Sequence, residues 1–416
     1  MLKFRSKMPL AAIVAAALLV VSACSSGGSD SSDTSSGSSV APTDSGDSGG
    51  SPEPGSADGA FKVIGKDIVD PNGNLFVPMG ANIGAPVVDS AGNEAWIFRL
   101  NGDDITTPES AAAVEEWGWN FLRVNAECSA QTPSENAPWG NEEMFTALDE
   151  VIDLYTSQGI VVAIECHDLT GESPSIDDPV YLEIAEFWKA AAERYGDNGY
   201  VWFNHLNEFD DGQSPETEWQ AVIDDAYNLF LETGTNNLVI FDLPNFGQRL
   251  PVMADPQYQE WSKTMCNVIW GWHSYGAVAP PGGDVTNPEE EAFNAEITKL
   301  LDNTVAAEIP ILIGEFGYDW DSNRKTTLFN YPAERFGALA ALKFGPPRGY
   351  GLAVWHANGA SPTAMTFGLK NSDDQTFAQP APSENLSEMG QLFWDLSQAQ
   401  KAAAPQPGPD GESCTR

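Results

Sequence analysis

Short runs of β-branched and aromatic residues alternate along this chain with longer segments whose apolar residues recur every three or four positions. The short runs are typical of buried strands, and the longer segments are typical of amphipathic helices. The runs that predict strands lie at 76–82, 120–125, 160–168, 200–208, 238–244, 268–275, 311–317 and 351–357. Eight strands separated by helices predict an α/β fold, a (β/α)8 TIM barrel.

The segment before the first predicted strand reads "FKVIGKDIVDPNGNLFVPMG" and has its own pattern. Two alternating runs flank the turn signal "DPNG", which predicts a β-hairpin, and we expect this hairpin to close the floor of the barrel. A doubly wound open sheet is the competing architecture. Neither a GxGxxG motif nor a P-loop follows the first strand, so the barrel is favoured.

The N-terminus has the pattern of a targeting segment. Three basic residues precede the apolar run "LAAIVAAALLVVSA", which is short for a membrane span, so residues 1–23 are interpreted as a secretory signal peptide. The run ends in "VSAC", which resembles the lipobox of bacterial lipoproteins and implies lipidation of Cys24. Two acyl chains would then anchor the protein on the outer face of a membrane, at the bacterial cell surface. An ordinary signal peptide, giving a secreted protein, is the alternative.

Composition divides the rest of the chain. Residues 24–59 are nearly all Ser, Gly, Asp and Pro, which predicts a flexible linker. Residues 60–400 are expected to form one catalytic domain, and 401–416 a C-terminal tail. A formal charge of -40 should repel nucleic acid and anionic surfaces, so the only membrane contact expected is the lipid anchor, and a neutral partner is favoured. We expect a monomer without a cofactor.

Four cysteines remain once Cys24 is assigned to the lipid, an even number in an oxidising compartment. Four cysteines allow three pairings. We favour Cys128 with Cys166, because both lie near the ends of adjacent predicted strands, which leaves Cys266 with Cys414. Free buried thiols are the alternative. No CxxC motif or Cys/His cluster is present, so no metal site is expected.

Polar and titratable residues gather at the C-terminal ends of the predicted strands. They are Asn82, Arg123, Asn125, His167, Asp168, Asn207, Glu208, Gln248, His273, Tyr275, Glu315, Trp355 and His356. A buried charge costs several kcal/mol unless it is paired, so a buried strand has little structural reason to end in one. In a barrel of parallel strands these ends meet at one mouth, where the chemistry of such barrels lies.

Two glutamates on opposite sides of such a mouth suggest glycoside hydrolysis. Glu208 ends the fourth predicted strand and Glu315 the seventh. Arg123 and Tyr275 can bind Glu315, keep it ionised and so suit it to act as the nucleophile. Burial and a nearby anion should raise the pKa of Glu208, which suits a general acid, and Asn207 can bind a sugar 2-hydroxyl. The residues expected to stack on sugar rings are Trp355, with Trp272 and Trp320 as further candidates.

In these residues the chain resembles glycoside hydrolase family 5, in the clan of barrels with catalytic glutamates on strands four and seven. The family positions that match are Arg123, His167, Asn207 and Glu208, His273 and Tyr275, Glu315, and Trp355. The segments "ECHDLTGES", "DLPNFGQ" and "ILIGEFG" are similar to the bacterial β-mannanase branch, which implies a retaining enzyme acting on β-1,4-linked mannan. The loops "GANIGAPVV" and "FDDG" depart from that branch, so a cellulase acting on β-1,4-glucan is the runner-up.

Two other classes of protein remain open. A catalytically silent barrel could bind carbohydrate as a lipoprotein, but such a protein would be free to lose one of the two glutamates, and both are present. A metal-dependent deacetylase or phosphatase would need clustered His and Asp ligands. The chain has only four histidines, and His205 is expected to point away from the mouth if Asn207 points inward.

Overall fold

The computed structural model describes residues 60–83, 85–88, 94–97, 99–100, 103–129, 141–275, 290–317, 331–355, 357 and 383–414. The expected signal peptide, Cys24 and the linker lie outside the described residues, as do Trp320 and His356. Among the described residues, no helix combines the length and the apolar character that a membrane span requires.

Eight parallel strands close a barrel in the order β10-β11-β12-β13-β14-β15-β4-β9. In chain order they are β4 (Met79–Ile83), β9 (Phe121–Ala126), β10 (Val161–Cys166), β11 (Val201–Asn204), β12 (Val239–Asp242), β13 (Val268–Ser274), β14 (Ile311–Phe316) and β15 (Gly351–Val354). Each overlaps one of the eight predicted runs, and the predicted TIM barrel is confirmed.

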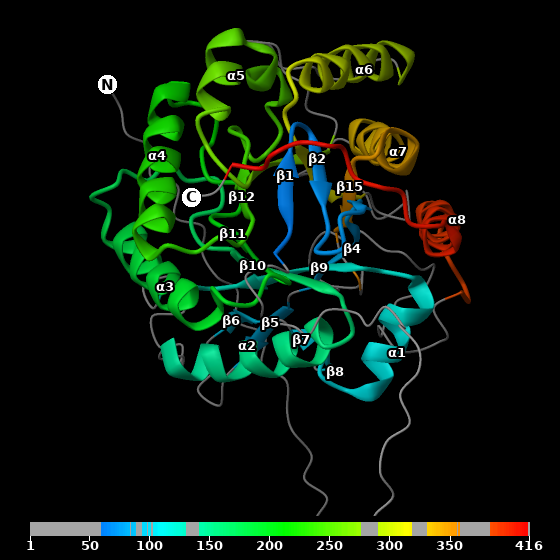
Figure 1. The fold of residues 1–416 in the computed structure, drawn as a ribbon, viewed down its shortest axis with the longest axis horizontal. Coiled ribbons are helices and arrows are strands. Elements are labelled where there is room, and N and C mark those ends of the chain that lie inside the picture. The colour runs from blue at the N-terminus through cyan, green and yellow to red at the C-terminus, as the bar shows by residue number, and fades with distance from the viewer. Residues whose placement is uncertain are drawn as a thin grey trace, which may run out of the picture. The chain divides into compact units, whose positions relative to one another are not determined.

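Each barrel strand is followed by a helix on the outside of the barrel (Figure 1). The helices are α1 (Pro108–Trp117), α2 (Asn141–Thr156), α3 (Pro179–Tyr195), α4 (Glu216–Thr233), α5 (Pro256–Ser262), α6 (Glu290–Ala306), α7 (Tyr331–Arg348) and α8 (Glu388–Ala402), with a 3-10 helix, η2 (Leu250–Ala254), before α5. Three of them begin in the same way, at Thr107, Asp178 and Asp255, whose side-chain oxygens accept a backbone N–H of the first turn. A proline follows each cap, at the position where its missing N–H costs nothing.

An insertion separates the first barrel strand from its helix. It contains two short antiparallel pairs, β5 (Ala85–Val88) with β6 (Glu94–Ile97) and β7 (Arg99–Leu100) with β8 (Asp103–Asp104). The insertion follows the C-terminal end of β4, the end at which the mouth of the barrel lies. It includes the loop in which the sequence departs from the β-mannanase pattern.

A small antiparallel sheet forms the floor, made of β1 (Lys62–Ile64), β2 (Asp67–Val69) and β3 (Leu75–Phe76). The predicted hairpin is present as β2–β3, and β1 adds a third strand to it. The ring of Phe61, just before β1, lies 5.4 Å from the ring of Trp202, which points into the barrel from β11. The sheet therefore fills the N-terminal end of the barrel with apolar side chains.

The C-terminal segment after α8 runs along this floor sheet, as the red trace beside β1 and β2 shows in Figure 1. The N–H of Leu75 donates to the carbonyl of Gln406, and the N–H of Gly408 donates to the carbonyl of Gly73. A disulfide between Cys266 and Cys414 holds its end. The second disulfide joins Cys128 to Cys166, and together the two bonds have the favoured pairing.

Alternation along each strand sorts its side chains between two cores. On β9, Leu122 and Val124 pack outward against the helices, whereas Phe121 packs inside the barrel. Apolar residues fill the interior only toward the floor. Toward the C-terminal ends, the inward positions of β9 hold Arg123 and Asn125 instead, which places the polar side chains at the mouth.

Candidate active site

Arg123 lies at the centre of the mouth and is completely buried. Its Nη1 donates to Oε1 of Glu315 at 2.7 Å and to Oδ1 of Asn82 at 2.6 Å. Its Nη2 donates to Oδ1 of Asn207 at 2.9 Å, and its Nε donates to Oδ1 of Asn204 at 2.7 Å. The side chain thus ties β9 to β4, to β14, to the end of β11 and to the residue before Glu208.

Three carboxylates surround the guanidinium group. Glu315, Asp242 and Glu165 approach Arg123 at 2.7, 3.3 and 3.8 Å. Burial disfavours the charge on Arg123, but these carboxylates outweigh burial and raise its pKa, so it stays cationic. Burial raises the pKa of Asp242 to about 6, while Arg123 pulls it back.

Glu315 is held from two sides. Arg123 binds one oxygen, and the hydroxyl of Tyr275 donates to Oε2 at 2.9 Å. The pairing of β13 with β14 shifts by one residue at Trp272/His273, so that His273 lies opposite Glu315. Burial raises the pKa of Glu315 to about 7 against the opposing effect of Arg123. A carboxylate oriented in this way by two donors suits nucleophilic attack.

Glu208 lies across the mouth from Glu315. Its Oε1 is 2.7 Å from Nδ1 of His273, and burial together with the charges of Glu315 and Asp242 raises its pKa well above the usual range. One oxygen of each glutamate and a ring nitrogen of His273 all lie within 4.8 Å of one another. A carboxyl that holds its proton beside one that is bound by arginine is the arrangement that general acid catalysis needs.

The backbone around Glu208 is strained. Glu208 and Asp210 both have positive φ, at 45° and 78°. The carboxylate of Asp210 compensates by accepting the N–H groups of Gly212 at 3.1 Å and of Asn245 at 3.0 Å. Left-handed non-glycine residues persist only where their surroundings fix them, and they cluster at functional sites.

His167 and Trp355 form a flat wall beside the glutamates. Their rings are stacked at 5.4 Å with an interplanar angle of 13°. Nδ1 of His167 is 3.2 Å from Oε2 of Glu165, which also accepts a hydrogen bond from the amide of Asn125. Burial lowers the pKa of His167, but the carboxylate of Glu165 outweighs burial and raises it. Stacked rings of this kind offer a face on which a sugar ring can pack.

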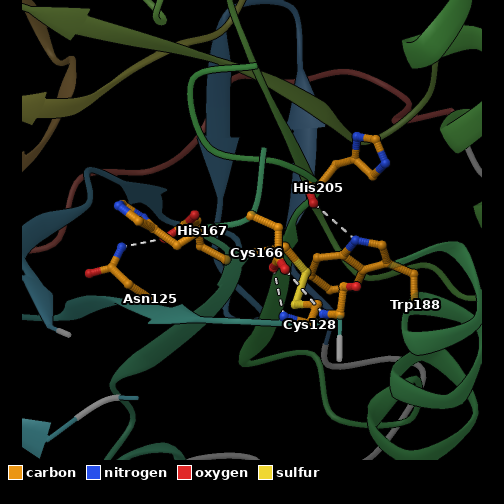
Figure 2. The surroundings of a disulfide bond; sticks show 9 residues. Asn125, Cys128, Cys166, His167, Trp188 and His205 are labelled. Atoms are coloured by element: carbon orange, nitrogen blue, oxygen red, sulfur yellow. Dashed lines mark hydrogen bonds and ion pairs between the residues drawn. A yellow bond between two sulfur atoms is a disulfide. The ribbon is translucent and has the colours of Figure 1, made fainter. Parts of the chain in front are cut away.

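The disulfide between Cys128 and Cys166 ties the segment after β9 to the end of β10, next to His167 (Figure 2). Asp168 supports it by accepting the N–H of Cys128 at 2.6 Å. Figure 2 also shows the His205 ring on the side of Trp188, away from His167. His205 is buried there, burial lowers its pKa to about 3, and the expectation that it points away from the mouth is confirmed.

One residue expected at the mouth lies elsewhere, and three residues of the site were not expected. Trp272 is not at the mouth, because it alternates with His273 and packs outward into the helix-side core. Glu165, Asn204 and Asp242 belong to the buried network but were not singled out. Alternation was the available signal for Glu165: if His167 faces inward, the residue two positions earlier does too.

This chain belongs to glycosyl hydrolase family 5: the family's cellulase model matches residues 82–360. The family to which the residues pointed is thereby confirmed.

Among individual proteins, the chain is 25% identical over 268 residues to a mannan endo-1,4-beta-mannosidase from Cellvibrio japonicus. That match covers 63% of this chain and 53% of the relative, so the chain spans about half the length of that protein. It is also 22% identical over 313 residues to endoglucanase A from Paenibacillus barcinonensis, covering 63% of this chain and 76% of that protein.

Solved structures share the fold. The catalytic domain of a mannanase from Streptomyces sp. SirexAA-E matches with a TM-score of 0.56 and 19% identity, over 82% of this chain and 93% of that one. The catalytic domain of an endoglucanase from Thermobifida fusca matches with a TM-score of 0.56 and 16% identity, over 82% of this chain and 97% of that one.

Proposed function

We propose that this protein is a retaining β-glycanase that cleaves β-1,4-linked mannan within the polymer by double displacement. The observation that carries the proposal is the pair Glu208 and Glu315, with oxygens within 4.8 Å of each other and different partners. Retaining glycosidases have carboxyl groups about 5 to 5.5 Å apart, whereas inverting enzymes leave room for a water between groups about 6.5 to 9.5 Å apart.

In the first step Glu315 attacks the anomeric carbon while Glu208 donates its proton to the glycosidic oxygen. The bond from the anomeric carbon to the leaving sugar breaks, and an ester bond from that carbon to Glu315 forms. Arg123 and Tyr275 each give Glu315 a hydrogen bond that favours its ionised form, the form in which it can attack.

In the second step a water molecule attacks the anomeric carbon and Glu208 takes its proton. The ester bond to Glu315 breaks, and the configuration at the anomeric carbon is that of the substrate. The charge of Glu315 is one reason why the pKa of Glu208 is high. Esterification removes that charge, so the pKa of Glu208 falls at the stage where it must act as a base.

The sugar in the reacting position would pack against Trp355 and contact Asn207. Oδ1 of Asn207 accepts from Arg123, and its Nδ2 donates to the hydroxyl of Thr170 at 3.0 Å, which fixes the amide in one orientation. A hydroxyl at C2 of the sugar can bind to such an oriented amide, and this contact strengthens in the transition state. Mannan is favoured by the mannosidase and mannanase relatives and by the "ECHDLTGES" and "DLPNFGQ" segments.

We also propose that a lipid on Cys24 anchors the enzyme outside the cell. Support comes from the basic, apolar and small-residue order of residues 1–24, followed by the Ser-, Gly- and Asp-rich linker. Metabolic labelling with radioactive palmitate is expected to mark the wild-type protein and not Cys24→Ala. A Cys24→Ala protein that still takes up label would contradict the lipid anchor.

The test of the catalytic proposal is release of reducing sugar by the full chain from galactomannan and, in parallel, from a soluble β-1,4-glucan. Glu315→Gln, which keeps the size of the side chain and removes its charge, is the matched control and is expected to abolish release. Proton NMR of the first products is expected to show the β-anomer before mutarotation.

Each outcome has a meaning. Release from mannan that is lost in Glu315→Gln supports the proposal, and preference for glucan would keep the mechanism but overturn the substrate. Appearance of the α-anomer first would refute retention. Inactivity on both polymers, with glycan binding intact, would favour the carbohydrate-binding alternative.

A further inference from the structure

Asp242, at the end of β12, contacts both halves of the catalytic apparatus although it faces neither the solvent nor the substrate. Its Oδ2 lies 3.3 Å from Nη2 of Arg123, 3.1 Å from the backbone nitrogen of Glu208 and 3.3 Å from Nε2 of His273. Its Oδ1 accepts from Nδ2 of Asn204 at 3.2 Å. One carboxylate thus contacts two sets of groups. The first is Arg123, which binds Glu315, and the second is the backbone N–H of Glu208 together with His273, which lies against the carboxyl of Glu208.

The two ring nitrogens of His273 face different acids. Nδ1 lies 2.7 Å from Oε1 of Glu208 and 3.6 Å from Oε2 of Glu315. Nε2 lies 3.3 Å from Oδ2 of Asp242, close enough for a strong electrostatic interaction but without the alignment of a hydrogen bond. Burial, with the charges of Arg123 and His167, lowers the pKa of His273 well below its usual value, so the ring is neutral and carries one N–H. The position of that one proton decides whether His273 donates to Glu208 or accepts from it.

The carboxylate of Asp242 favours the proton on Nε2. An ionised carboxylate only accepts, so Nε2 is favourable beside it when protonated and repulsive when it presents a lone pair. Nδ1 is then the lone-pair nitrogen, and a hydrogen bond across the 2.7 Å to Glu208 requires the proton to be on Oε1 of Glu208. A hydrogen bond to the neutral form of an acid favours that form.

We propose that Asp242 is a positioning residue that holds His273 as its Nε2–H tautomer, so that Nδ1 accepts a hydrogen bond from Glu208 and keeps Glu208 in its proton-donating form. This proposal rests on the proposed role of Glu208 as general acid. It adds a residue, Asp242, that acts on Glu208 without touching a substrate atom.

Local packing makes room for this arrangement. Gly271 lies opposite Asp242 in the β12–β13 pairing, and a Cβ at Gly271 would lie only 2.4 Å from Oδ1 of Asp242. A Cβ at Gly247 would lie 2.6 Å from Cγ of the His273 ring. Glycine at both positions is what lets the carboxylate and the imidazole approach each other and Glu208.

The backbone of Glu208 supplies a second connection. Glu208 has a φ of 45°, and its N–H donates to Oδ2 of Asp242 at 3.1 Å, a hydrogen bond that offsets part of the cost of the left-handed conformation. The oxygen of Asp242 that faces His273 therefore also fixes the backbone position from which the side chain of Glu208 extends. Asp242 controls both the position of the acid and the partner that keeps it protonated.

Replacing Asp242 by Asn should lower the pKa of Glu208 for two reasons. The negative charge that raises this pKa disappears, and an amide that donates to Nε2 turns His273 into the Nδ1–H tautomer, which stabilises ionised Glu208. The other titratable and charged groups that face this pair stay in place. They are Arg123 on β9, Glu165 and His167 on β10, Tyr275 after β13, and Glu315 on β14.

The first measurement is the tautomer of His273 by ¹H–¹⁵N NMR of the histidine side chains of the full chain. Only four histidines are present, so the spectrum of His273→Gln assigns the signal. We expect Nε2–H in the wild type and Nδ1–H in Asp242→Asn. A wild-type ring with its proton on Nδ1 overturns the proposal, even if Asp242→Asn does not fold.

The second measurement is the pH dependence of kcat/KM. In Asp242→Asn the alkaline limb is expected to move down by about one pH unit or more. The loss of kcat should be about 10- to 100-fold for glycosides with poor leaving groups and small for activated aryl glycosides, which need little proton donation. An alkaline limb that stays in place overturns the proposal.

Asp168→Asn is the matched control, because Asp168 is a similarly buried carboxylate just after β10, two strands away from β12 in the barrel, and it binds the backbone N–H of Cys128. We expect it to lower stability without changing the tautomer or the alkaline limb. The NMR readings, including a ¹³C titration of the Glu208 carboxyl, need no substrate. Inactivity of the wild type on every glycan would therefore refute the proposed function and leave the tautomer result to decide this inference separately.

Discussion

Replacing Arg123 by Met tests how much of the stability of the barrel depends on one buried cation. Arg123 is completely buried and faces Glu165, Asp242 and Glu315 at 3.8, 3.3 and 2.7 Å. Methionine fills much of the volume but removes the cation that the three buried carboxylates share. Removing one partner of a buried ionic group costs about 3 to 5 kcal/mol, a large part of the roughly 5 to 15 kcal/mol by which domains are stable.

The size of this loss should depend on pH, with a definite sign. Arg123 lowers the pKa of each of the three carboxyl groups. Without it the pKa values of Asp242 and Glu315 rise further above their values in the unfolded chain, and the pKa of Glu165, which is lowered in the presence of Arg123, rises as well. An acid with a raised pKa in the folded state costs stability at pH values above its unfolded pKa, and the cost disappears as the pH falls below that value. The deficit of Arg123→Met should therefore be largest near neutral pH and shrink toward about pH 4.

The assay is guanidinium unfolding followed by tryptophan fluorescence, at about pH 7.5 and about pH 4.5, with the disulfides oxidised. The control is Arg335→Met, which breaks an ion pair with Glu388 whose side chains are 29% and 56% exposed. An exposed pair of this kind is worth about 0 to 1 kcal/mol. A loss for Arg123→Met no larger than that of the control, or equal losses at the two pH values, would refute the reasoning.

Three further changes test other parts of the structure. Tyr275→Phe removes a hydrogen bond that favours ionised Glu315, so the acidic limb of kcat/KM should move up by about one pH unit, and an unmoved limb would contradict this role. Joint replacement of Cys128 and Cys166 by Ser opens a 38-residue loop, and the chain-entropy model predicts a loss of about 4 kcal/mol in the free energy of unfolding. Guanidinium unfolding under non-reducing conditions measures this loss, and a value under about 1 kcal/mol would contradict the prediction. Phe61→Ala empties the floor of the barrel and should cost about 3 to 5 kcal/mol in unfolding while initial rates of the folded enzyme hold steady, and a large drop in kcat would show that floor and mouth are coupled.

The barrel was predictable because its strands are buried on both faces and therefore appear as apolar runs of the right length. The polar strand ends were also predictable, because a charged residue such as Arg123 or Glu315 is conspicuous in a run of apolar residues. Glu165 and Asp242 escaped notice because each lies inside or at the edge of such a run. Their place in the buried network becomes clear only when it is known which residues of each strand face the barrel interior.

The relation between His273 and Glu315 lay beyond sequence reasoning altogether. It depends on the one-residue shift between β13 and β14, at which pairing passes from Trp272–Ile313 to His273–Glu315. Regular pairing would have moved His273 one position along β14 and changed its distance from both acids. A bulge of this kind is decided by tertiary packing, and the run "VIWGWHSY" carries no sign of it.

The charge balance of the mouth explains why the acid is Glu208. Four carboxyl groups share the interior with one arginine, and they are Glu165, Asp242, Glu315 and Glu208. The first three lie 2.7 to 3.8 Å from the guanidinium group of Arg123, whereas Glu208 has the imidazole of His273 against its carboxyl. Burial makes an excess of negative charge costly, and the excess is relieved most easily by a proton on the acid farthest from the cation. The excess of buried negative charge lowers the stability of the folded state. It also keeps on Glu208 the proton that glycoside cleavage requires.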